Sequence, residues 1–75
     1  MNPKEQALAL EKEILTTLGF QMNSHMFHSI ANYTINKIIS EYEAVVTYSN
    51  ETNKSAINAI LFWKDVRKEI ANLKQ

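Results

Sequence analysis

The sequence has no cysteine, and it has one glycine and one proline among its 75 residues. The absence of cysteine excludes disulfides and thiolate metal sites, and it favours a reducing compartment such as the cytoplasm. So few glycines and prolines indicate few turns and long, uninterrupted elements. A chain of this length forms a single domain, residues 1–75, and domains of this size bury only about 60% of their unfolded surface.

The chain also lacks an excess of charge of either sign and lacks a long hydrophobic run. Eight basic side chains balance eight acidic ones, so no net charge attracts the protein to nucleic acid or to an anionic membrane. The longest apolar run, Ala59 to Trp63, is much too short to cross a bilayer. The first residues do not show the basic-then-apolar pattern of a signal peptide. We therefore expect a cytoplasmic protein without a membrane span.

Helical periodicity begins with a segment of about residues 3–18. Asn2 can cap a helix, Pro3 suits the first helical position, and Glu5 stands where a capping box needs it. Gly19 falls where a left-handed C-terminal cap is expected. Apolar residues at steps of three and four form one stripe, which consists of Ala7, Leu8, Leu10, Ile14, Leu15 and Leu18.

Two longer helical segments follow, over about residues 24–48 and 52–73. Asn23 or Ser24 can cap the first of them, and Ser49, Asn50 or Thr52 can cap the second. The inward stripe of residues 24–48 consists of Phe27, Ile30, Ala31, Ile35, Ile38, Tyr42 and Val45. The inward stripe of residues 52–73 consists of Ala56, Ala59, Trp63, Val66, Ile70 and Leu73.

These patterns predict an all-α fold without a strand. Residues 44–48 are rich in β-branched side chains, but no second strand is available to pair with them, so we expect them to be helical. The predicted architecture is a three-helix bundle, in which a short helix accompanies a long antiparallel hairpin of the second and third helices. Because one such chain has a thin core, we expect two copies to form a homodimer.

The candidate catalytic and metal-binding residues are few. His25 and His28 share one helix face because they are three positions apart, and they are weak candidates for a metal site. No motif supplies the third and fourth ligands that zinc needs, so solvated or capping histidines are favoured and no cofactor is expected. The chain has neither a glycine-bearing nucleophile elbow nor a phosphate-binding glycine loop. We therefore expect no enzymatic activity.

Charge is unevenly distributed along the chain. Residues 1–53 contain three lysines and six glutamates, a net charge of −3, whereas residues 54–75 have a net charge of +3. A basic last helix complements the helix macrodipole and suits packing beside acidic neighbours. The alternative is a nucleic-acid-binding regulator that uses the basic end of this helix, but Asp65 and Glu69 interrupt the basic residues. Nucleic acid is therefore not the partner that we favour.

The last helix is apolar on nearly all sides between residues 57 and 63, which is more than one inward face requires. The apolar residues that lie off its stripe, together with nearby aromatic and basic side chains, are typical of a protein interface. The predicted partner-binding residues are Ile57, Leu61, Phe62, Tyr48, Lys64, Arg67 and Lys68. This predicts a small inhibitor or adaptor, of phage, plasmid or bacterial origin, that occludes a site on a larger protein. A bacteriocin-type immunity protein is the alternative within the same class.

Overall fold

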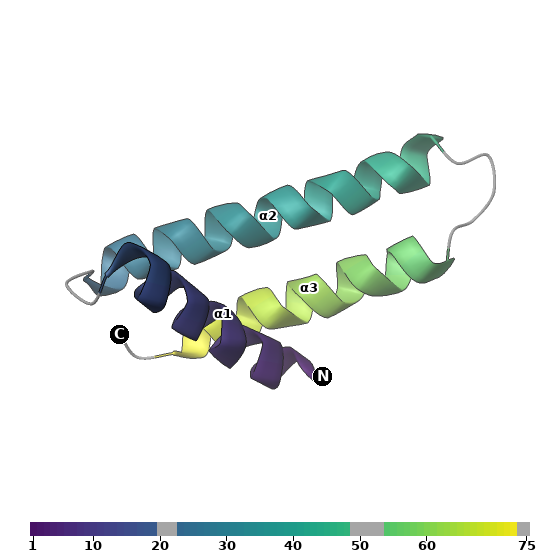
Figure 1. The fold of residues 1–75 in the computed structure, drawn as a ribbon. Coiled ribbons are helices and arrows are strands. Elements are labelled where there is room, and N and C mark those ends of the chain that lie inside the picture. Colours follow the sequence, from purple (N-terminus) through teal and green to yellow (C-terminus); the bar gives the residue numbers. More distant parts are fainter. Residues whose placement is uncertain (20–22, 49–53, 74–75) are drawn as a thin grey trace.

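The computed structural model describes residues 1–19, 23–48 and 54–73, and within these ranges the chain forms three α-helices and no strand. Helix α1 spans Pro3–Leu18, α2 spans Ser24–Tyr48 and α3 spans Lys54–Asn72 (Figure 1). The all-helical prediction is confirmed, including the helical conformation of residues 44–48. The predicted start of the third helix, at about residue 52, lies outside the described residues. The same holds for its candidate caps, Ser49, Asn50 and Thr52.

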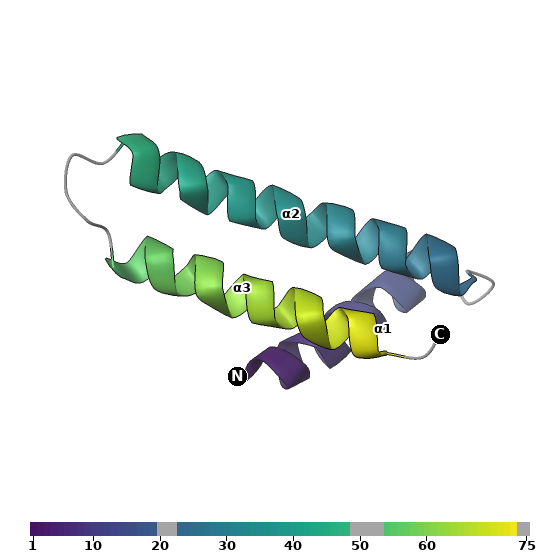
Figure 2. The same ribbon diagram turned by 180° about the vertical axis from the view of Figure 1, so that it is seen from behind.

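Helices α2 and α3 lie side by side, with the start of α2 beside the end of α3 (Figures 1 and 2). Helix α1 crosses this pair at that same end, where it packs mainly against α3 and less against α2. The molecule is consequently long and thin, with principal extents of 46 × 20 × 17 Å. At its other end, α2 and α3 extend beyond α1.

Side-chain caps begin α1 and α2. The Glu5 backbone N–H donates to Asn2 Oδ1 at 2.8 Å, and the Asn2 N–H donates to Glu5 Oε1 at 3.3 Å. This pair is the expected capping box. At the start of α2, the Met26 N–H donates to Asn23 Oδ1 at 2.8 Å, so Asn23 is the residue that caps this helix.

Gly19 ends α1, but not in the conformation that we expected. Its backbone N–H donates to the Leu15 carbonyl at 3.0 Å, and its φ of 97° is positive. Its ψ of 162° lies outside the left-handed helical region and within a region that is essentially restricted to glycine. Glycine is needed here for its backbone freedom, since no neighbouring atom would meet an added Cβ.

Apolar side chains from all three helices form one core. Its members, each less than a tenth exposed, are Ala7, Leu10, Ile14, Phe27, Ala31, Ile35, Ile39, Val66 and Ile70. Five half-buried side chains pack against it, namely Ile30, Ile60, Phe62, Trp63 and Leu73. No polar or charged side chain is buried in the part of the chain that the structure describes. The fold is therefore stabilised mainly by apolar burial, at about 25 cal/mol per Å² removed from water.

The structure corrects the predicted inward stripes at four positions. Ile39 is buried although we did not predict it, whereas Val45 is 46% exposed and Leu8 is 43% exposed. Phe62 packs against the core, although we had expected it to lie off the inward face. The reason is that α3 contacts two helices, which widens its buried arc, while the C-terminal part of α2 has only α3 beside it.

Phe27 is fully buried, so replacing it with alanine removes a large side chain from the centre of a small core. We expect Phe27→Ala to lower the free energy of unfolding by about 3–5 kcal/mol. A domain of 75 residues has a free energy of unfolding of about 4–11 kcal/mol, so this variant loses a substantial part of its stability. Urea denaturation followed by circular dichroism measures the effect.

Tyr33 provides the matched control, because it is an aromatic residue of the same helix that is 71% exposed. Tyr33→Ala should change the free energy of unfolding by no more than about 0.5 kcal/mol. Equal denaturation midpoints for the two variants would contradict the core described here.

Candidate protein-interaction surfaces

Four of the seven predicted partner-binding residues lie on the same face of α3. They follow one another at steps of four, three and four, so they form one line along the helix. We call this line the outer stripe, and it consists of Ile57, Leu61, Lys64 and Lys68. Leu61 is 56% exposed, both lysines are exposed and Ile57 is half-buried. The outer stripe is thus an accessible apolar pair followed by two cations.

The other three predicted residues do not join the outer stripe. Phe62 is half-buried against the core, and its ring meets that of Trp63 edge-on, with centroids 5.7 Å apart. Arg67 Nη1 donates to Asn36 Oδ1 at 2.7 Å, so this guanidinium links α3 to α2. Tyr48 is the last residue of α2 and is 86% exposed. Sequence spacing did not separate these roles because they depend on where the neighbouring helices lie.

The two histidines have different surroundings. His25 is exposed, whereas His28 is half-buried, with its Nε2 atom 3.1 Å from the carbonyl oxygen of Ile70. A carbonyl oxygen only accepts, so the Nε2–H of His28 donates to this carbonyl, which also accepts from the Leu73 N–H at 3.1 Å. The His28 ring also meets Phe27 at a centroid distance of 5.2 Å and an interplanar angle of 61°. His28 therefore connects the start of α2 to the end of α3.

The two histidines have no further ligands beside them in the described ranges. There, no group of three or more His, Cys, Asp or Glu side chains could hold a metal ion. The Nε2 atom of His28 is also engaged by a backbone carbonyl rather than open to a metal. The hydrogen bond of His28 to the end of α3 fits the capping interpretation of this histidine.

The hydrogen bond of His28 and its contact with Phe27 should contribute measurably to stability. We expect His28→Ala to lower the free energy of unfolding by about 1–2 kcal/mol. The matched variant His25→Ala removes the same side chain from an exposed position and should have little effect. Thermal and urea denaturation of both variants test this, and equal losses would contradict the assigned role of His28.

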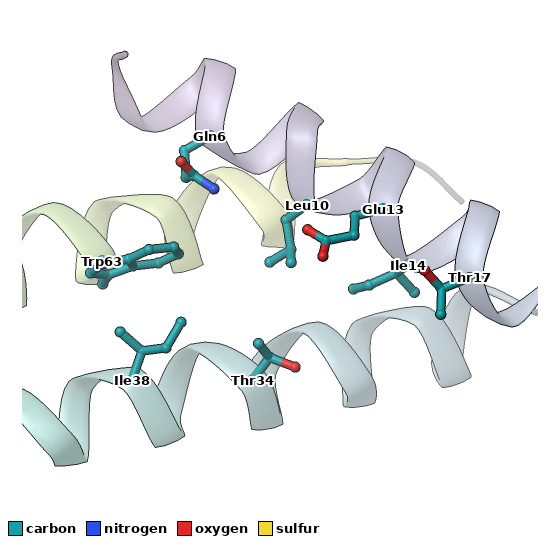
Figure 3. A pocket seen from close by; sticks show the side chains of 8 residues that line it. All are labelled: Gln6, Leu10, Glu13, Ile14, Thr17, Thr34, Ile38 and Trp63. Carbon is teal, nitrogen blue, oxygen red and sulfur yellow. The ribbon is translucent and has the colours of Figure 1, made fainter.

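The structure also shows an apolar groove that we did not predict. One part of it encloses about 400 Å³ between α1, α2 and α3 (Figure 3). Leu10 and Ile14 project from α1 towards α2, while Ile38 of α2 projects towards Trp63 of α3. The residues that line this part are Gln6, Leu10, Glu13, Ile14, Thr17, Thr34, Ile38 and Trp63.

The groove continues along α2 beyond the N-terminal end of α1. This second part encloses about 500 Å³ and shares Ile38 and Trp63 with the first. Its other lining residues are Glu41, Tyr42 and Val45. We refer to both parts together as the groove.

The sequence did contain a signal for this groove. Ile38, Tyr42, Val45 and Trp63 all lie on the apolar stripes, and we had interpreted them as core residues. They line a groove instead, because α1 has only 16 residues and crosses one end of the α2–α3 pair. Only the position of α1 distinguishes a stripe that is covered from one that is partly open.

No helix among the described residues is long and apolar enough to cross a membrane. Comparison with known protein families, with curated protein sequences and with solved structures found no match for this chain. The fold and its surfaces define a small, elongated helical protein with an outer stripe on α3 and a groove beside Trp63.

Proposed function

We propose that this protein is a small, non-enzymatic interaction module of the cytoplasm. It acts as an inhibitor or adaptor, and it occludes a site on a larger protein with the outer stripe of α3. The observation that carries this proposal is the 56% exposure of Leu61 within a line of apolar and basic side chains. Ten apolar side chains are buried within residues 1–19, 23–48 and 54–73, and a chain that leaves such a leucine exposed beside them has a surface suited to a partner.

The outer stripe combines two contributions to binding. Burying the exposed part of Leu61 against the target would contribute about 1 kcal/mol to the free energy of binding, and burying Ile57 would add to it. Lys64 and Lys68 would remain at the rim, where cations mainly raise the association rate and select an acidic target surface. A nucleic-acid target is less well supported, since apolar side chains occupy half of the stripe and Asp65 is exposed on the same helix.

We also propose that, without its target, the protein forms a homodimer through the outer stripe. In this proposal, α2 and α3 of each copy act as one antiparallel hairpin, and two hairpins pack side by side. The slender shape supports it, because a body 46 Å long and 17 Å thick has little interior of its own. A second copy and the larger target then compete for the same surface.

The variant Leu61→Asp tests the role of the outer stripe. It places a charge at an exposed position of α3, so the chain should fold while the target is no longer captured from a lysate of the native host. The matched variant Ser55→Asp introduces the same charge at an exposed position of α3 that is not three or four positions from any residue of the stripe, and it should capture the target like the unaltered chain. Mass spectrometry identifies the captured protein, and capture by Leu61→Asp would contradict the proposal. Phe62→Asp is less suitable, since Phe62 packs against the core.

Sedimentation equilibrium tests the homodimer. We expect the unaltered chain to have twice the 8.6 kDa mass of one copy, and we expect Leu61→Asp to have the mass of a single chain. The physical reason is that a two-fold contact centred on position 61 would bring two carboxylates together among apolar side chains, where they repel each other and lose their hydration. A single-chain mass for the unaltered protein at high concentration would exclude the homodimer.

A further inference from the structure

We propose that the groove binds an amphipathic helix of another protein, one with an apolar stripe flanked by lysine or arginine residues. This binding surface is distinct from the outer stripe of α3 and does not depend on the function proposed above. Together the two surfaces would allow the protein to contact two partners at once.

The length and lining of the groove match a helix. On α2, its lining runs from Thr34 through Ile38 and Glu41 to Val45, at steps of four, three and four. These twelve positions extend about 16 Å, or three helical turns. A bound helix of that length can place anchors at i, i+3 or i+4, and i+7, which is the usual helix-in-groove arrangement.

The floor of the groove offers the apolar contacts that such anchors need. Ile38 and Trp63 are shared by both parts of the groove and are each half-buried, so a ligand would complete their burial. The hydroxyl of Thr34 donates to the Ile30 carbonyl of its own helix at 2.9 Å. That hydroxyl therefore does not require a polar partner from the ligand.

The charges at the groove select a basic ligand. Glu13 of α1 and Glu41 of α2 are exposed and line the groove, whereas the uncharged Trp63 is what α3 contributes. Among the residues that the structure describes, no lysine, arginine or histidine lines either part. A helix with cations beside its apolar stripe complements both carboxylates, and an acidic helix would be repelled.

The same charges disfavour a second copy as the occupant. Two grooves that face each other would bring four glutamates together. The basic outer stripe of a second copy would complement the groove, but Leu61 lies about 160° from Trp63 around the axis of α3. Each copy would then use two different faces, so the contact would propagate from copy to copy instead of closing into a dimer. A helix from a different protein avoids both difficulties.

The experiment uses two designed peptides of about 18 residues that share one leucine stripe and lack tryptophan. One carries lysines beside the stripe and the other carries glutamates. Trp63 is the only tryptophan of the chain and lies in the groove, so its fluorescence reports binding directly. We expect a saturable change with the lysine peptide and an affinity for the glutamate peptide that is at least about tenfold lower.

Variants of the full chain locate the binding site. Glu41→Gln should weaken binding of the lysine peptide about two- to fivefold. Glu43→Gln, at an exposed position outside the groove, should leave the affinity unchanged. Val45→Lys should weaken binding of the lysine peptide more than about tenfold, because it replaces an apolar side chain of the groove with a cation that repels the peptide, and Val45 is exposed enough for the chain to fold. Leu61→Asp should bind the peptide normally, which separates this surface from the outer stripe.

Three results would overturn the inference. The first is no saturable change of Trp63 fluorescence with the lysine peptide. The second is equal affinity for the two peptides, or normal binding of the lysine peptide by Val45→Lys when circular dichroism shows that this variant is folded. The third is a dimer in sedimentation that Val45→Lys or the lysine peptide dissociates, since a second copy would then occupy the groove.

Discussion

The burial of α3 between two other helices is the constraint on which the rest of the structure depends. Val66 and Ile70 are fully buried in a core that includes side chains from α1 and α2. Helices α1 and α2 have few contacts with each other, so α3 holds them in one body. A chain of 75 residues without cysteine has no disulfide to replace this packing, and its stability follows the apolar area that α3 covers.

This constraint divides the surface of α3 into distinct arcs. The inward arc is wide because two helices share it, and it includes Phe62 as well as the residues at regular spacing. Next to it, Trp63 is only half-buried and lines the groove. The opposite arc bears Ile57 and Leu61, which no other helix covers fully. Helix α3 thus contributes apolar side chains to the core and to two exposed surfaces, and we connect its surplus of apolar residues with binding.

Particular residues show how far sequence reasoning extends. Asn2, Glu5 and Asn23 cap their helices as their types predict, because capping depends on contacts within four residues. The burial of Val45 and Ile39 was not predicted correctly. Both are apolar residues of α2, and they differ only in how far other side chains cover them. The groove could not be predicted for the same reason, although Ile38 and Trp63 were recognised as inward-facing. The position of α1 depends on many weak contacts between residues that are distant in the sequence, and no local sequence pattern predicts it.

The sequence by itself determined the class of fold, the extents of the first two helices, the caps that begin them and the stripes from which the core is drawn. These features depend on helical period, side-chain polarity and hydrogen bonds between near neighbours, which are properties of short segments. Only the tertiary structure decided that Phe62 packs inward, that Arg67 binds Asn36 and that Ile38 and Trp63 line a groove. Those outcomes depend on how far α1 reaches over the pair of longer helices, which is settled only when all three helices pack together.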